Sequence, residues 1–298
     1  MSITAEIVAD SLNPKGKRLT TFVLNLPRIV LAELNTHRAF SRNSASSRAI
    51  PFAKMLEMVK VNPFIPIRFQ KDHKGMQGVE YFEGQEHQDC VVDWLTARNM
   101  AIEAATTFTH PVTKQLRNRL LEPFMWHRVI LTGTDFENFF ALRAHKDAEI
   151  HIAELAEKML AAYNNSNPKQ LNVGDFHIPF GDRFDTTRLE SLYYSDKFRI
   201  GQTQFSQVSP FTDLKMRISI ARCARISYHN YEGKDCYETD MNTCDKLFGA
   251  IPRHLSPTEH VAEALDSEDY IGNFCGFKQY RYFFNDQNLK DNRVIQKT

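Results

Sequence analysis

A polar, cationic stretch of residues 36–48 holds the side chains best suited to chemistry in this chain, and apolar runs flank it on both sides. Its three arginines carry rigid donor forks that match phosphate oxygens in pairs, and its four serines add small hydroxyl groups. This composition indicates a phosphate site. It fits a helix N-terminus with solvated arginines equally well, so the residue types alone leave both interpretations open.

Composition limits the class of protein. The chain has 298 residues, of which 42% are hydrophobic and 24% charged, with a formal net charge of +1. Such a chain is globular, and its near-neutral charge argues against nucleic acid as a partner. The five cysteines include no C-x-x-C pair, which argues against a zinc site or a disulfide scaffold and fits a reducing cytoplasm. The absence of a signal pattern or membrane-length apolar run predicts a cytoplasmic protein without membrane spans.

Hydrophobic periodicity predicts an α+β fold that positions the 36–48 stretch. Thr134 and Glu137 have the spacing of a capping box, which predicts the start of the longest helix of the chain. The polar, turn-rich segment 164–209 is expected to be an irregular insertion, either a lid or a subunit contact. Strands are expected at 18–26 and 126–132, helices at 29–35, 51–61, 89–107, 111–122, 137–160, 214–227, 240–251 and 257–265, and a closing strand or helix at 270–284.

Generic catalytic motifs are missing from the sequence. There is no P-loop, no G-x-G-x-x-G after a strand, no H-E-x-x-H and no G-x-S-x-G. His145 and Glu149 lie one helical turn apart in the expected long helix, but no second cluster of ligands accompanies them, so no metal site is predicted. Ser46 has no recognisable activating base, and a phosphate-contacting hydroxyl is the better interpretation.

The pattern H-R-x-x-S-x-N-x-x-S-x-R over residues 37–48 closely resembles the signature of flavin-dependent thymidylate synthases. Thr36 departs from it where the family has an arginine, and Ser44 where the family usually has a glutamate. Residues 119–123, residues 138–143 and the pair His145 and Glu149 resemble later elements of the family in the same order, although Asp147 replaces a usual glutamine. The resemblance explains that pair better than a metal does.

Two further segments resemble family elements but stand in a different order. Residues 222–228 and 254–260 match elements that precede the signature in the family, whereas here they follow it. A circular permutation of the phage type accounts for this order, and permutation is tolerable because domain termini usually lie at the surface. The resemblance implies one catalytic domain over 1–298, with a mixed or antiparallel sheet flanked by long helices.

The resemblance also implies an activity: reductive methylation of dUMP to dTMP with FAD, methylenetetrahydrofolate and NAD(P)H, by a homotetramer. Gln279 is favoured over Glu33 at the substrate glutamine position, because a carboxylate would repel phosphate; an amide that caps a buried turn is the other interpretation. The implied catalytic residues are Arg143 and Ser46; the substrate-binding residues are Ser46, Arg48, Arg119, Arg143 and Gln279; and the cofactor-binding residues are His37, Arg38, Asn43, Asn138, His145, Ser227, His254 and Ser256.

Two rival functions stay open. A permuted relative could act on dCMP or stop at a hydroxymethyl product, since the departures at Thr36, Ser44 and Asp147 leave room for another substrate. A flavin-free nucleotide-binding or nucleic-acid-binding remnant could instead use Arg38, Arg42 and Arg48 as its basic patch.

Overall fold

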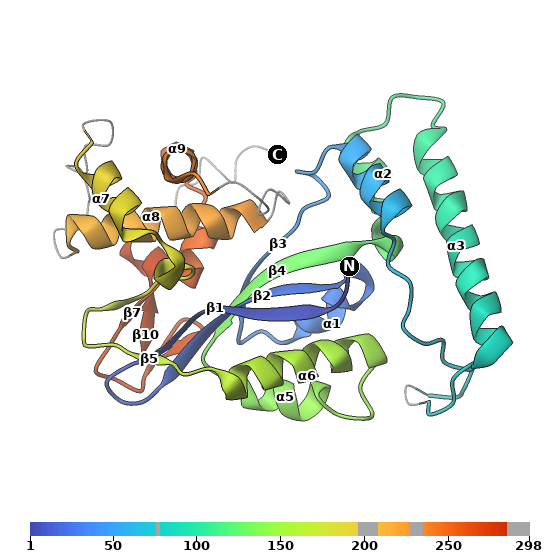
Figure 1. The fold of residues 1–298 in the computed structure, drawn as a ribbon, viewed down its shortest axis with the longest axis horizontal. Helices are drawn as coiled ribbons and strands as arrows, with labels where there is room; N and C mark the ends of the chain where they lie inside the picture. Colours follow the sequence, from blue (N-terminus) through green and yellow to red (C-terminus); the bar gives the residue numbers. More distant parts are fainter. Residues whose placement is uncertain (76–77, 196–207, 227–234, 285–298) are drawn as a thin grey trace, which may run out of the picture.

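A mixed five-stranded sheet forms the centre of the computed structural model, which describes residues 1–75, 78–195, 208–226 and 235–284 (Figure 1). The strand order is β3-β4-β2-β1-β5; the first four strands are antiparallel neighbours, and β5 adds parallel to β1. The sheet and the helices around it confirm the predicted α+β class. The strands are β1 (Thr4–Leu12), β2 (Arg18–Pro27), β3 (Ser41–Ser44), β4 (Trp126–Gly133) and β5 (Lys169–Gln170).

Two smaller sheets lie at one end of the large sheet. β10 (Phe277–Gln279), β7 (Ala262–Ala264) and β6 (Phe176–His177) form one antiparallel sheet, and β8 (Tyr270–Ile271) pairs with β9 (Phe274–Cys275) in the other. The three-stranded sheet therefore joins segment 164–209 to the C-terminal part of the chain. The same segment also contains β5, η3 (Gly181–Arg183) and α7 (Thr186–Tyr193), so its described part is more regular than the sequence predicts.

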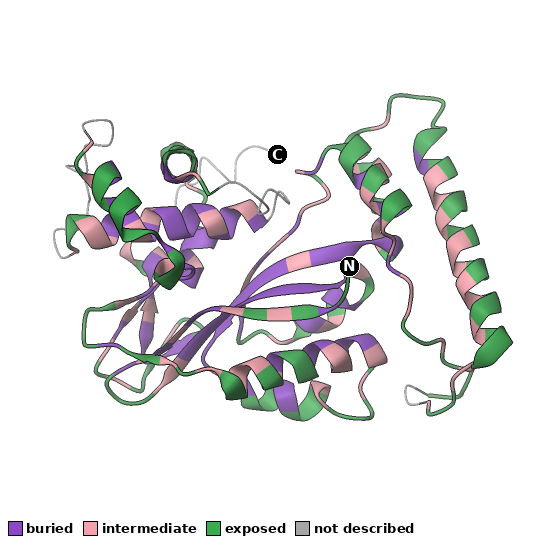
Figure 2. Ribbon diagram, in the orientation of Figure 1, coloured by how far each residue is buried: buried purple, intermediate pink, exposed green. Residues whose placement is uncertain are grey.

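Helices cover both faces of the large sheet because its central strands alternate apolar side chains between two buried clusters. Phe22 and Leu24 pack with Leu155 of α6, whereas Val23 packs with Ile218 of α8 on the opposite face. Figure 2 shows the resulting buried colour along β2 and β4. The helices are α1 (Leu31–Thr36), α2 (Phe52–Val61), α3 (Gly84–Thr106), α4 (Lys114–Arg119), α5 (Glu137–Arg143), α6 (Ile150–Asn165), α8 (Pro210–Arg225) and α9 (Tyr237–Gly249), with short turns η1 (Arg28–Val30), η2 (Glu122–Phe124), η5 (Ser256–His260) and η6 (Tyr280–Phe283).

The long helix predicted over 137–160 is wrong, because the chain forms two helices there, α5 and α6. Thr134 does not cap α5: its hydroxyl donates to Asp135 Oδ2 at 2.7 Å. Glu149 instead caps α6, where its Oε2 accepts from the backbone amides of His151 at 2.9 Å and Ile152 at 3.1 Å. His145 and Glu149 therefore do not share a helical face, and α3 is the longest helix in the described residues.

The helix predicted at 257–265 is also wrong. Residues Ser256–His260 form the short turn η5, and Ala262–Ala264 then form β7 between β6 and β10. The sequence A-E-A favours helix locally, but strand pairing on both sides outweighs that preference. In the described part of the chain, no helix has the length and apolarity to cross a membrane, and no group of three His, Cys, Asp or Glu could hold a metal ion.

Loss of the Glu149 cap is expected to destabilise α6. Glu149→Ala leaves the amides of His151 and Ile152 without their carboxylate acceptor, and it removes the contact with the buried imidazole of His151. We expect the free energy of unfolding in urea to fall by about 1–2 kcal/mol. The control Glu157→Ala, at an exposed position of the same helix, should change it by under about 0.5 kcal/mol. Equal effects of the two variants would contradict the capping role.

Candidate functional site

The 36–48 stretch runs from the end of α1 through the edge strand β3 (Figure 1). It ends in a turn that contacts α4. Arg42 joins β3 to the end of α1: its Nη1 donates to the carbonyl oxygens of Leu34 at 3.1 Å and His37 at 2.8 Å. A cation on the last carbonyls of a helix is favourable. Arg42 is therefore a structural residue here, whereas Arg38 and Arg48 are exposed.

Arg143 meets the 36–48 stretch at its first residues. Its Nε donates to His37 Nε2 at 3.0 Å, and its Nη1 lies 3.1 Å from Glu33 Oε2. Within the described residues, Arg143 Nη2 has no hydrogen-bond partner, so this nitrogen can donate to a ligand. The His37 ring also packs in a T-shaped arrangement against Phe139 of α5, with ring centroids 4.9 Å apart. Two segments about one hundred residues apart thus form one corner.

The contact with Arg143 fixes the protonation state of His37. Because an arginine Nε–H can only donate, His37 Nε2 must be an acceptor, which leaves the ring proton on Nδ1. Burial lowers the pKa of His37, and the charges of Arg143 and Arg42 lower it further. His37 is therefore a neutral imidazole that offers a donor at Nδ1.

Asn43 connects β3 to η5 in the middle of the stretch. Its amide lies 3.2 Å from Ser256 Oγ and 3.2 Å from His260 Nε2. Asn43 and His260 are buried, whereas Ser256 and His254 are exposed. Two residues predicted from separate segments to contact the cofactor, Asn43 and Ser256, therefore touch.

Gln279 contacts the stretch from β10. Its side chain is buried, and its Nε2 donates to Ser41 Oγ at 2.7 Å and to the Glu259 carbonyl at 3.2 Å. The amide thus ties β10 and η5 to β3. Its proposed role with substrate stays a prediction. Glu33, the other candidate for that position, lies beside Arg143.

The turn after β3 carries Ser46 and Arg48 and lies against α4. Asn118 of α4 donates through Nδ2 to the carbonyl oxygens of Ser47 at 2.8 Å and Ile50 at 3.0 Å. Because Asn118 is fully buried, this contact fixes the position of α4 on the turn. Arg119 follows Asn118 directly, and the side chains of Arg48 and Arg119 are both exposed.

The remaining predicted residues divide into exposed positions and one outside the described residues. Asn138 and His145 are exposed at α5 and in the loop after it. Ser227 lies outside the described residues. The segment before it contains Arg222 and Arg225, whose guanidinium groups pair with the buried carboxylate of Asp240 at 3.2 and 2.7 Å.

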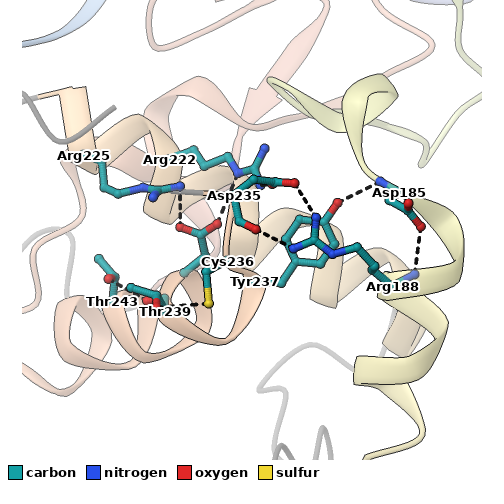
Figure 3. Close-up of polar contacts among 10 residues, drawn as sticks. Asp185, Arg188, Arg222, Arg225, Asp235, Cys236, Tyr237, Thr239 and Thr243 are labelled. Carbon is teal, nitrogen blue, oxygen red and sulfur yellow. Dashed lines mark hydrogen bonds and ion pairs between the residues drawn. The ribbon is translucent and has the colours of Figure 1, made fainter. Parts of the chain in front are cut away.

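Those two arginines belong to a network of polar contacts among α7, α8 and α9 (Figure 3). Asp235 binds both Arg222 and Arg188, while Tyr237 Oη accepts from the Asp185 amide at 2.7 Å. The charges of this network compensate one another. Arg222 therefore links α8 to α7 through Asp235 and to α9 through Asp240, and Arg225 adds a second ion pair with Asp240.

Two cavities lie elsewhere in the described molecule. One, of about 480 Å³, is lined by charged and apolar residues of α2 together with Met1, Asn62, Met125 and Trp126. The other, of about 300 Å³, is lined by residues of α7 and the start of α9. No residue of the 36–48 stretch lines either cavity.

Sequence reasoning missed two features of the site. The first is the ion pair between Glu33 and Arg143, because Glu33 was considered only as a replacement for a glutamine. Its spacing of four residues from His37 could have indicated that the two share a helical face. The second is the structural role of Arg42. No sequence signal indicates it, because the partners of Arg42 are backbone carbonyls, which every sequence has.

The fold and the site together define an α+β protein in which an edge strand gathers polar groups from distant segments. No family model matches the sequence, and no curated protein matches it. Among solved structures, the UMP/dUMP methylase PolB from Streptomyces cacaoi, bound with 5-Br UMP, resembles 55% of this chain over 89% of its own, with 18% identity and a TM-score of 0.45. The flavin-dependent thymidylate synthase ThyX from Helicobacter pylori, complexed with FAD and dUMP, resembles 49% of this chain over 67% of its own, with 18% identity and a TM-score of 0.34.

Proposed function

We propose that this chain is a flavin-dependent thymidylate synthase, which methylates dUMP to dTMP with methylenetetrahydrofolate as carbon donor and NAD(P)H as reductant. The contact between Arg143 and His37 carries the proposal. It joins the segment 138–143 to the signature-like residues 37–48, although only sequence resemblance had connected them. The Asn43 and Ser256 contact adds segment 254–260 in the same way.

The residues around the stretch fit a flavin nucleotide. An FAD molecule carries a diphosphate, hydroxyl groups and a flat ring with both donors and acceptors. Arg38, Asn138, His145 and His254 offer exposed cationic or polar groups for these, and Ser256 adds a hydroxyl. His37 adds a neutral ring that donates from Nδ1, and the buried Asn43 orients the Ser256 hydroxyl. When bound, FAD supplies the redox chemistry that side chains lack; Ser227, outside the described residues, is proposed to bind it as well.

The protein side chains are left with positioning and charge stabilisation. In the proposal, Arg48, Arg119 and Ser46 hold the nucleotide phosphate, since two exposed guanidinium groups can share its charge. Arg143 lies at the pyrimidine, where its fixed cation stabilises negative charge that develops on the ring. The bonds from Arg143 to Glu33 and His37 hold the guanidinium in one orientation before the substrate arrives. Gln279 is the proposed amide of the substrate site.

The assembly belongs to the proposal too. We infer a cytoplasmic homotetramer of single catalytic domains in permuted element order. α3 supports an oligomer, because Val92 and Met100 expose 61% and 67% of their surface on a helix in which only Ala105 is buried.

Flavin absorbance and label transfer test the proposal together. We expect the purified full-length chain to show the absorbance of bound flavin, or to acquire it on addition of FAD. With labelled methylenetetrahydrofolate and NADPH, the label should pass to dUMP and not to dCMP. A colourless protein that gains no flavin absorbance would favour a nucleotide-binding module. Transfer to dCMP alone would assign the enzyme to another pyrimidine.

A further inference from the structure

A chain of buried hydrogen bonds runs from the interior of the large sheet to Asn43. Ser11 Oγ lies 2.9 Å from His177 Nδ1, and His177 Nε2 lies 2.8 Å from Thr21 Oγ1. Thr21 Oγ1 lies 2.8 Å from Thr132 Oγ1, which lies 2.8 Å from His260 Nδ1. His260 Nε2 reaches the Asn43 amide at 3.2 Å. None of these six residues exposes more than 9% of its surface.

The chain passes through six elements that the sequence separates widely, and it begins at Ser11 on β1. His177 comes from β6, Thr21 and Thr132 are paired across β2 and β4, and His260 comes from η5. Cross-strand threonine pairs form such hydroxyl contacts when they share a face. Asn43 ends the chain on β3 beside the exposed Ser256.

The number of hydrogens on these groups sets the same donor-to-acceptor direction in all five hydrogen bonds of the chain. Burial lowers the pKa of His177 to about 4 and that of His260 to about 3, so both rings are neutral near pH 7. A neutral imidazole donates from one nitrogen and accepts at the other, and a hydroxyl has one hydrogen. A hydroxyl oxygen can accept twice, so reversal at His177 would let Thr21 accept from both neighbours, but its own hydrogen would then lack an acceptor among the described residues. An unpaired donor in a buried site is costly.

The surroundings of Asn43 select the direction. The amide has its best set of partners with its nitrogen toward the carbonyl oxygens of Ser256 at 3.3 Å and Arg42 at 3.1 Å. In this orientation its oxygen accepts from Ser256 Oγ at 3.2 Å, and its nitrogen faces His260 Nε2 at 3.2 Å. His260 Nε2 must then accept, so the proton of that ring is on Nδ1. His260 Nδ1 then donates to Thr132, Thr132 donates to Thr21, and Thr21 donates to His177 Nε2. His177 Nε2 is therefore an acceptor, and the proton of His177 is on Nδ1.

We propose that Ser11, His177, Thr21, Thr132 and His260 form a positioning relay that holds the Asn43 amide, and through it the Ser256 hydroxyl, in a single orientation at the cofactor side of the site. These residues touch no ligand themselves; they act through Asn43. The naming of a flavin as the ligand rests on the proposed function, whereas the relay does not.

The relay also assigns the chemistry that Ser256 offers to a ligand. Because the Ser256 hydrogen is donated to Asn43 Oδ1, the exposed oxygen can only accept. An accepting oxygen fits a hydroxyl or an imide N–H of the cofactor and does not fit a phosphate oxygen. In the proposed enzyme, Ser256 therefore contacts a sugar-chain hydroxyl or the flavin ring, and the diphosphate goes to the exposed Arg38.

Histidine tautomers test the relay without any ligand. In long-range ¹H–¹⁵N spectra of the full chain near pH 7, His177 and His260 are expected to be neutral, each with its proton on Nδ1. The two signals are assigned by their loss in His177→Gln and His260→Gln. Different tautomers in the two rings, or protons on both Nε2 atoms, would overturn the proposed relay.

Flavin affinity tests the positioning role. Thr132→Val removes the hydroxyl that joins the two halves of the relay at nearly constant volume, and we expect the Kd for FAD to rise about tenfold. Thr132→Ser restores the hydroxyl and should restore the affinity. Thr20→Val is the matched control: Thr20 is equally buried on β2, but its hydroxyl donates to Asp10 Oδ1 at 2.8 Å, outside the relay.

The two tests separate the relay from the proposed function. Equal FAD affinities for Thr132→Val and the wild type would overturn the positioning role. If the wild-type chain binds no FAD, the proposed function fails, while the tautomers of His177 and His260 still decide whether the relay exists.

Discussion

Arg143→Ala is expected to lower kcat/KM for dUMP by roughly 10²–10³-fold while the chain stays folded. The variant removes a fixed cation that the proposed reaction needs at the pyrimidine, and removal of one such stabilising group costs about that factor. Its effect on stability should be small. Glu33, the carboxylate left behind, keeps 38% of its side-chain surface in solvent, and exposed ion pairs contribute little to stability.

Two further variants distinguish a role in catalysis from a general effect of charge. Arg143→Lys keeps the cation but cannot donate from a rigid fork to His37 and Glu33 together, so we expect it to recover little of the lost activity. Arg28→Ala is the matched control, because Arg28 pairs with Glu122 at the same 3.1 Å distance and with similar exposure. A loss of activity in Arg28→Ala equal to that in Arg143→Ala would contradict the assignment.

Long periodic elements could be predicted from the sequence because their signal is local. β2, β4, α2 and α8 lie close to their predicted ranges, since each repeats an apolar pattern along a buried face. The break between α5 and α6 had no such signal. Residues 144–149 favour helix by composition, and the new helix start depends on where the Glu149 carboxylate binds.

The candidate site was only partly accessible to sequence reasoning. Resemblance brought Arg143, Asn43 and Ser256 into one hypothesis, and the structure places Arg143 beside His37 and Asn43 beside Ser256. Their catalytic and binding roles stay predictions. The relay could not be predicted at all. Its links join residues such as Thr21 and His177, which are 156 positions apart, and serine, threonine and histidine at such separations carry no pattern that one sequence reveals.

Acidification is expected to destabilise the protein below about pH 6.5 through the two buried histidines of the relay. The ordinary histidine pKa of 6.5 applies to the unfolded chain, whereas burial lowers the folded values to about 4 for His177 and about 3 for His260. Below pH 6.5 these two histidines therefore bind protons in the unfolded chain but stay neutral in the folded chain. The free energy of unfolding then falls by up to about 1.4 kcal/mol per pH unit for each histidine, until the folded pKa is reached.

Carboxyl groups change the size of this slope. The charge of Asp10 favours protonated His177, although burial outweighs it. Asp213 acts in the opposite direction on the whole protein: burial raises its pKa to about 6, so the folded chain takes up that proton first and gains stability as the pH falls toward 3.8. The wild-type slope alone therefore mixes histidine and carboxylate contributions, and a comparison of variants is needed to separate them.

The difference between wild type and His177→Asn isolates one histidine. The variant loses stability at pH 7, because Thr21 and Ser11 lose their ring partner, but it carries no group that refuses a proton at this position. Urea unfolding between pH 6.5 and 4.5 gives the free energy of unfolding as a function of pH. Its slope should be shallower in the variant than in the wild type, by an amount that corresponds to up to one bound proton. Asp213 contributes equally to both proteins. Parallel slopes would show that His177 takes up its proton in the folded chain, and the neutral, fully bonded ring on which the relay depends would then be wrong.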